Sequence, residues 1–196
     1  GINNTALGYL AGTAVTTGEQ NTLIGALAGD ALTDADYNTA VGQDALHTDT
    51  LGSRSVAIGR RSLYTQNFTT ATDNYNVGVG FNAGYSVTTG VHNVFVGGLA
   101  GDGTDDGNNS VAVGYLALSG NCGDSNVAIG LEALKVTTGA ANTCIGKNSG
   151  DAVTSGSNNL FAGNDSGRTG SPGGNITNDA NKIVLGDDNI AEAHIQ

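Results

Sequence analysis

The chain has 196 residues, a length that fits one domain, and its 32 glycines, single proline and lack of methionine and tryptophan set it apart from ordinary globular domains. Seven basic residues against 18 acidic ones give a formal net charge of -11, which argues against nucleic acid and anionic membrane surfaces as partners. Its apolar runs are only a few residues long, so we expect no membrane insertion.

A five-residue unit recurs from one end of the chain to the other. It reads Asn or Ser, then usually Val or Thr, a small residue, an aliphatic residue and Gly. The repeat glycines are Gly8, Gly25, Gly42, Gly59, Gly80, Gly97, Gly114, Gly130, Gly146, Gly163 and Gly186. Subtracting successive numbers gives spacings of 17, 17, 17, 21, 17, 17, 16, 16, 17 and 23. A nearly constant period over the whole chain is typical of a solenoid.

Each unit predicts a short β-strand. The expected strands are 4–8, 21–25, 38–42, 55–59, 76–80, 93–97, 110–114, 126–130, 142–146, 159–163 and 182–186. The residue before Gly and the residue two places earlier share one strand face, and the small residue between them lies on the other. Both faces are apolar, so we expect the strand to be buried on both sides, with the small face packed against neighbouring chains that seal the interior.

Between strands, a small residue followed by Gly or Leu predicts a tight corner, as at Ala11-Gly12 and Ala45-Leu46. Val-Thr-Thr-Gly at 15–18, 87–90 and 136–139 predicts a second short strand in those coils. Seventeen residues are too few for a βαβ unit, which needs about 30. The sequence therefore predicts an all-β, parallel β-roll or β-solenoid of about eleven coils of 16–17 residues.

The repeated units carry a family resemblance. Ser55-Val56-Ala57-Ile58-Gly59 and Asn38-Thr39-Ala40-Val41-Gly42 resemble the head repeats of trimeric autotransporter adhesins, and similar repeats occur in bacteriophage tail fibres. The resemblance implies a left-handed parallel β-roll and an intertwined homotrimer. It implies little about a ligand, because the repeats are scaffold.

The C-terminal part is expected to differ from the regular roll. Residues 1–167 form the repetitive β-roll, whereas 168–196 hold an irregular insertion, the last repeat and a terminal segment. Residues 181–190, together with 191–196, resemble the segment ahead of the endosialidase-type chaperone of phage tail fibres and spikes, whose own residues are absent here. The chain stops about where the mature product of such a fibre would stop.

These patterns predict a structural or receptor-binding fibre protein of a bacteriophage tail, located in the virion tail and extracellular. Its expected partners are sister subunits in a homotrimer, a host cell-surface glycan or protein, and other virion tail proteins. The head of a bacterial trimeric surface adhesin is the alternative. An ice-binding solenoid, favoured only by Thr5, Thr22, Thr39 and Thr143 at the first strand position, and a polysaccharide-degrading spike are less favoured. We expect no enzyme activity, cofactor or metal site.

The longer spacing between Gly59 and Gly80 holds the candidate receptor contacts Tyr64, Phe68 and Tyr75. Exposed tyrosines beside Asn, Thr and Asp would stack on sugar rings and bind their hydroxyls. The alternative is that these rings fasten the extra loop to the roll. The other long spacing contains Arg168 to Ala180, which is interpreted as the transition from the regular roll to a differently packed end, with a plain linker as the alternative.

The remaining polar residues favour structural roles. The asparagines that open eight of the eleven coils predict a stacked ladder that binds backbone groups of the turns. The acidic positions are expected in solvated turns, since their spacing matches no calcium motif. They are Asp102, Asp105, Asp106, Asp187 and Asp188. His47, His92 and His194 are isolated, and so are the thiols of Cys122 and Cys144.

Overall fold

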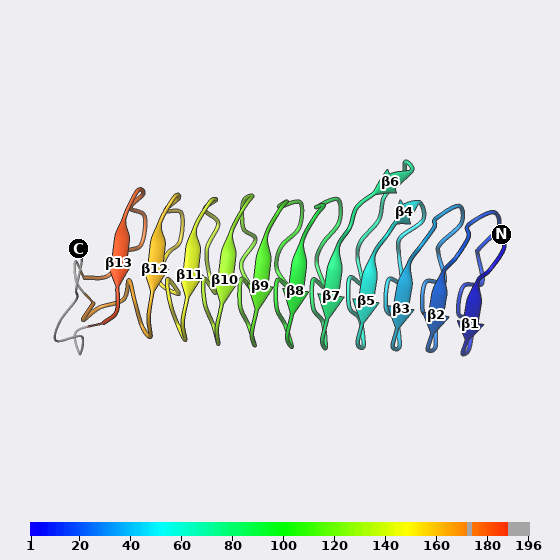
Figure 1. Cartoon of the computed structure of the whole chain (residues 1–196), viewed down its shortest axis with the longest axis horizontal. Coiled ribbons are helices and arrows are strands. Elements are labelled where there is room, and N and C mark those ends of the chain that lie inside the picture. Colours follow the sequence, from blue (N-terminus) through cyan, green and yellow to red (C-terminus); the bar gives the residue numbers. More distant parts are fainter. Residues whose placement is uncertain (172–173, 188–196) are drawn as a thin grey trace.

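The computed structural model describes residues 1–171 and 174–187, and within them the protein is all-β, with no helix. Eleven strands form one continuous parallel sheet that runs the length of a rod, with the N-terminus at one end (Figure 1). The strands are β1 Thr5–Leu7, β2 Thr22–Ile24, β3 Thr39–Val41, β5 Val56–Ile58, β7 Val77–Val79, β8 Val94–Val96, β9 Val111–Val113, β10 Val127–Ile129, β11 Thr143–Ile145, β12 Leu160–Ala162 and β13 Ile183–Leu185. The predicted parallel β-solenoid is confirmed.

Successive coils stack in register. Val77 pairs with Val94 and Val79 with Val96, so equivalent positions of the repeat lie above one another along the sheet. The eleven strands in the described part of the chain delimit ten coils, slightly fewer than the number of repeat units, because a coil closes only when the next strand is reached. β13 continues the same sheet beyond the insertion at 168–180 and pairs with β12.

The second strand predicted in several coils is wrong. Residues 15–18, 87–90 and 136–139 contain no strand, and the wall opposite the sheet is built from turns and bends. Val87 N donates to Gly84 O at 3.2 Å, whereas Thr88 N donates to Asp105 O of the next coil at 2.9 Å. A coil of 17 residues has to reverse direction within this wall, so hydrogen bonds inside a coil alternate with bonds between coils and no regular ladder forms.

An additional small sheet joins the long coil between Gly59 and Gly80 to the coil before it. β4, Gly52–Ser53, pairs in parallel with β6, Thr72–Asp73, and the two lie where the main strands begin. The long coil is four residues longer than the 17-residue period. The extra length projects beyond the outline of the rod beside β4 and β6 (Figure 1).

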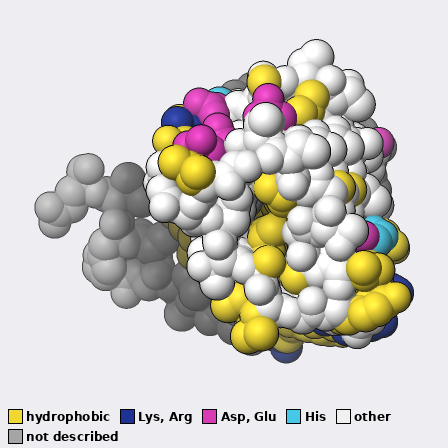
Figure 2. All heavy atoms as spheres, turned by 90° about the vertical axis from the view of Figure 1, so that its right-hand side faces the viewer, with side chains coloured by type: hydrophobic (Ala, Val, Ile, Leu, Met, Phe, Trp, Pro, Cys, Tyr) yellow, Lys and Arg dark blue, Asp and Glu magenta, His cyan; other side chains and the backbone are white. Residues whose placement is uncertain are grey.

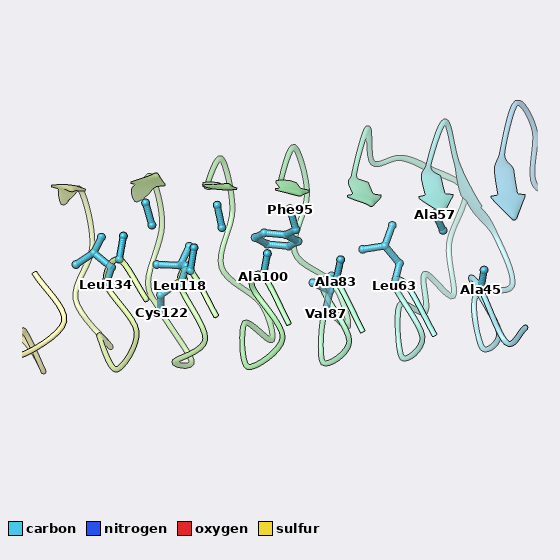
Figure 3. Close-up of a cluster of buried hydrophobic side chains, with 14 of the residues drawn as sticks. Ala45, Ala57, Leu63, Ala83, Val87, Phe95, Ala100, Leu118, Cys122 and Leu134 are labelled. Carbon is cyan, nitrogen blue, oxygen red and sulfur yellow. The ribbon is translucent and has the colours of Figure 1, made fainter. Parts of the chain in front are cut away.

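The core is a narrow column inside the coils. The middle residue of each strand points inward and meets small residues and leucines of the opposite wall, as Ala57 and Phe95 do in Figure 3. Large and small residues alternate along the column, since Phe95 lies beside Gly78 of the preceding strand. A methyl group on Gly101 would lie 2.3 Å from the Phe95 ring. These contacts leave the middle residues of β2 to β12 fully buried.

The predicted orientation of the strand faces is therefore reversed. The small face was expected to contact neighbouring chains, but it lines the interior of its own chain, and the larger aliphatic residues point outward. The cause is the short circumference of the coil, because two walls so close together leave room mainly for Ala, Gly, Cys and a few larger residues. Each chain seals its own interior without a sister subunit.

The repeat glycines allow the coils to stack closely. Gly97 has φ of 136°, and a Cβ at this position would lie 2.6 Å from the carbonyl oxygen of Gly114 in the next coil. No L-residue with a side chain fits both conditions. The invariant Gly that ends each repeat unit thus reflects backbone contact between adjacent coils.

The asparagine ladder predicted from the sequence is present. Asn38 N donates to Asn21 Oδ1 at 2.9 Å, Asn38 Nδ2 donates to Gly52 O at 2.9 Å, and Ser55 N donates to Asn38 Oδ1 at 2.8 Å. Each buried Asn thus joins the coil before it, its own coil and the coil after it. Serine replaces Asn in two coils and preserves the acceptor, since Asn126 N donates to Ser110 Oγ at 3.2 Å.

Candidate interaction surfaces

The outward side of the eleven-stranded sheet is an apolar surface, which we call the sheet face. It consists of the first and third residues of each strand, 22 positions of which 18 are aliphatic and four are Thr5, Thr22, Thr39 and Thr143. None of them is charged. Ile58 is 39% exposed, Ile129 38% and Ile145 46%, although they lie in the middle of the sheet.

The sheet face is about as large as the largest apolar patch that an isolated soluble chain usually leaves open. Ten intervals of about 4.8 Å give a length of about 48 Å, and the three residues of each strand span about 10 Å, or about 480 Å² in all. The largest apolar patch of a typical monomer covers about 300–600 Å². A standard protein interface buries about 800 Å² on each partner. The sheet face thus has the uncharged, apolar composition of an interface, and the corner residues on its two sides would have to join it to reach that area.

Two rows of corner residues border the sheet face. The leading flank is the residue two places before each strand, and it includes Tyr37, Arg54, Tyr75 and His92. The trailing flank is the residue directly after each repeat glycine. Its exposed members are Tyr9, Gln43, Arg60, Phe81, Tyr115, Leu131, Lys147 and Asn164. Hydrophobic side chains both inside the first coil and on its outer margin are visible when the rod is viewed from the β1 end (Figure 2).

The structure separates the three predicted receptor contacts. Phe68 is only 6% exposed, so its ring packs inside the long coil, as the alternative interpretation expected, and is not open to a receptor in this structure. Tyr64 is half-buried on the wall opposite the sheet. Tyr75 is 50% exposed and belongs to the leading flank. These three residues do not converge on one site, because they occupy different positions of the coil.

Tyr64 is the centre of a stack that runs along the rod axis. Its ring lies 5.0 Å from that of His47 and 5.1 Å from that of Tyr85, with interplanar angles of 13° and 2°. His47 Nδ1 pairs with Asp30 Oδ1 at 2.7 Å, and the Arg61 guanidinium lies 5.5 Å from the Tyr64 ring centre. Both faces of the Tyr64 ring are covered by neighbours, so it offers its edge and hydroxyl rather than a face on which a sugar would stack.

A second stack lies on the leading flank. The Arg54 guanidinium sits between the rings of Tyr37 and Tyr75, at 4.6 and 5.8 Å from their centres, and Tyr75 stacks on His92 at 5.8 Å. Arg54 Nε also pairs with Asp73 Oδ2 of β6 at 3.0 Å. This contact places the projecting segment beside the leading flank. The sequence signal for both stacks is that most of their members are one 17-residue period apart.

A buried polar network fixes the root of the projecting segment. Asp49 Oδ1 accepts hydrogen bonds from Gly52 N and Phe68 N, each at 3.0 Å, and Oδ2 accepts one from Gln66 Nε2 at 2.6 Å. Gln66 Nε2 also donates to Ser55 Oγ at 2.8 Å. Burial raises the pKa of Asp49, and these hydrogen bonds oppose the rise. The segment is therefore held by specific bonds rather than attached as a free loop.

The remaining acidic candidates do not form a shared site. Asp102 is half-buried and its pKa is raised mainly by desolvation, Asp105 accepts a hydrogen bond from Thr88 Oγ1, and Asp106 is exposed. Asp187 borders a hollow of about 500 Å³ near the last coil. Asp188 and His194 lie outside the described residues.

The same hollow contains an ion-pair cluster. Arg168 Nε lies 3.1 Å from Asp151 Oδ1, and Arg168 Nη1 lies 2.9 Å from Asp165 Oδ1. A hydrogen bond from Asn148 lowers the pKa of Asp165 most, whereas burial raises that of Asp151. One guanidinium thus serves two carboxylates of successive coils, which ties the start of the second insertion to the rod.

Residues 1–171 and 174–187 contain no group of three or more His, Cys, Asp or Glu side chains placed to hold a metal ion. No helix long and apolar enough to cross a membrane occurs in the same ranges. Cys122 and Cys144 are both free and buried.

Comparison of the chain with protein-family models, with curated proteins and with solved structures finds no match.

Proposed function

We propose that this chain is a rod segment of a homotrimeric bacteriophage tail fibre that contacts or projects toward the host cell surface. The observation that carries the proposal is the sheet face, which is uncharged, mostly aliphatic and continuous over eleven strands. A second copy of the same chain is the partner that offers a matching surface of the same length. Burying this face against sister subunits removes the apolar area from water.

The number of subunits and the type of fibre come from the sequence resemblance. Units such as Ser55-Val56-Ala57-Ile58-Gly59 resemble repeats of trimeric adhesins and phage fibres, and the segment from Asn181 resembles the end of fibres that carry a removable chaperone. The second of these features favours a tail fibre over the head of a bacterial surface adhesin. Other tail proteins and a host glycan or protein complete the proposed set of partners.

The sheet face also weighs against an ice-binding role. Thr22 and Thr39 are neighbours on it, but five strands with Val at the equivalent position separate them from Thr143. On the opposite wall, threonine hydroxyls are engaged with the backbone, as where Thr33 Oγ1 donates to Thr50 O at 3.1 Å. Within residues 1–171 and 174–187, neither of these surfaces therefore carries a flat array of free hydroxyls along its whole length.

Assembly is tested by sedimentation or light scattering of the native protein. A trimer has three times 19.4 kDa, about 58 kDa, and we expect this mass at micromolar concentration. Ile129→Glu places a charge in the middle of the sheet face and should shift the protein to 19.4 kDa. Thr138→Glu, an exposed position on the opposite wall, is the matched control and should remain trimeric. A native monomer or dimer would refute the trimer.

The type of fibre is tested separately. The gene that encodes this chain should continue, after the codon for Gln196, into an endosialidase-type chaperone if the chain belongs to a phage fibre. A coiled coil followed by a membrane anchor at the same place would support the adhesin and overturn the tail-fibre assignment. Neither outcome depends on the oligomer measurement.

A further inference from the structure

The projecting segment of the long coil has a counterpart on the other flank of the same coil. Residues 69–71 and Asp73 are exposed, and the Asp73 side chain keeps 53% of its surface in solvent although it pairs with Arg54. The segment extends past the leading flank of the sheet face (Figure 1). A segment in this position reaches toward whatever lies against that flank.

The trailing flank of this coil carries an unpaired cation. Arg60 is exposed, its guanidinium lies 5.8 Å from the ring of Phe81, and it forms no ion pair with any carboxylate in the described part of the chain. Arg61 of the same coil and Arg54 of the preceding coil are both paired. Phe81 is itself 48% exposed. In a chain of net charge -11, a free arginine beside an open aromatic ring is a surface that an acidic partner complements.

A closed ring of three subunits brings the two flanks together. Contacts in such a ring are heterologous, so the leading flank of each copy meets the trailing flank of the next. With the copies level, the projecting segment of one copy faces Arg60 and Phe81 of its neighbour. Asp73 would then lie between two guanidinium groups, and Tyr75 would lie opposite Phe81.

Repetition makes the axial register of such an assembly ambiguous. A slip of one coil, about 4.8 Å, replaces Val by Val or Ile over most of the sheet face and costs little. Devices that occur once along a repetitive surface are the usual means of excluding such slips. The projecting segment and the Arg60–Phe81 pair each occur once in the described residues, and both lie in the same coil.

We propose that segment 69–73 fixes the register of the fibre by placing Asp73 of one copy against Arg60 of a second copy. The proposal rests on the self-association proposed above and adds the contact that aligns the copies. Each exposed ion pair changes the equilibrium constant between the level and the slipped arrangement by about threefold. Three equivalent pairs in a ring multiply to about thirtyfold in favour of the level arrangement.

Cysteine cross-linking measures the register directly. Asn109→Cys on the leading flank is combined, in three separate proteins, with Gly98→Cys, Tyr115→Cys or Leu131→Cys on the trailing flanks of three successive coils. Cys122 and Cys144 are buried, so they do not compete in the native protein. With the native segment present, we expect one of the three pairs to form an intersubunit disulfide and the other two to remain largely reduced.

The register variants are Arg60→Glu and deletion of residues 70–73, which restores a 17-residue spacing. Either should spread the cross-links over at least two pairs, whereas Lys147→Glu, the same charge change on the trailing flank five coils away, should leave a single pair. A trimer whose Arg60→Glu variant still forms a single pair would overturn the register proposal and leave the trimer intact. A native protein that sediments as a monomer would overturn both.

Discussion

The asparagine ladder makes a graded prediction about stability. Asn93 is fully buried; its Nδ2 donates to Gly107 O at 2.8 Å and its Oδ1 accepts from Ser110 N at 2.9 Å. Asn93→Ala leaves both partners buried and unsatisfied. Each such group costs about 1–3 kcal/mol, so the free energy of unfolding should fall by about 2–6 kcal/mol. Asn93→Ser retains an acceptor, as Ser110 does naturally, and should lose about half as much.

Chemical denaturation followed by circular dichroism, at one fixed protein concentration, gives the three free energies of unfolding. The concentration is held constant because self-association contributes to apparent stability. Hydrogen exchange adds a local readout, and we expect the amide of Ser110 to lose protection in Asn93→Ala but less in Asn93→Ser. Equal stability of all three proteins would show that the stacked side chains do not hold successive coils together.

Three further predictions concern single positions. Gly97→Ala should prevent close stacking and unfold adjacent coils, because its Cβ would meet the Gly114 carbonyl, whereas Gly98→Ala, which meets only the Tyr115 ring at 3.5 Å, should be tolerated; thermal melts compare the two. Burial raises the pKa of Asp49, so the native state keeps its proton at a pH where the unfolded chain has lost it. The stability that Asp49 contributes should be greatest below about pH 4 and fall as pH rises through the native pKa, a slope that Asp49→Asn removes in pH-dependent denaturation. Burial raises the pKa of Cys144 to about 12, so its thiol should not react with a thiol reagent at pH 8 until denaturant is added, and prompt reaction in the native protein would contradict this burial.

The period and the residues that enforce it were predictable from the sequence. Glycine at one position in every unit signals a backbone constraint, and the structure shows it as the contact between Gly97 and the next coil. Asn at the start of most units signals a repeated polar contact, and the ladder supplies it. Both features depend on interactions between equivalent residues of neighbouring coils, so a repeat in the sequence is enough to reveal them.

The orientation of the strand was not predictable by the same reasoning. Ala112 and Val113 alternate along a strand whichever side faces the interior, because both faces are apolar and hydrophobicity therefore carries no signal. The side-chain volume that fits between the two walls decides which face points inward. The structure shows this limit, because Ala117 and Leu118 of the opposite wall fill the same narrow column. A wall made of turns rather than a second strand is what makes that column so thin.

The candidate receptor residues failed to converge for a different reason. Tyr64 and Tyr75 are close in sequence, but they occupy different positions of the coil, and each stacks on residues about one period away rather than on the other. In a solenoid, residues one period apart lie next to each other along the axis. Residues of the same coil lie close together only if they occupy neighbouring positions around it. Searching the sequence for side chains one 17-residue period apart would have identified His47 as a neighbour of Tyr64 and His92 as a neighbour of Tyr75.

A closed interior changes how folding and assembly are related. Had sister subunits been needed to seal the coils, any variant that blocks association would also unfold the chain. Because the middle residues of β2 to β12 are fully buried by their own chain, the coil has a core before any partner arrives. Ile129→Glu should therefore yield a monomer that keeps its β-sheet circular dichroism and its protected amides along the asparagine ladder. An unfolded monomer would mean that the sheet face is required for the fold itself, and the separation between core and interface drawn from the burial of these strands would be wrong.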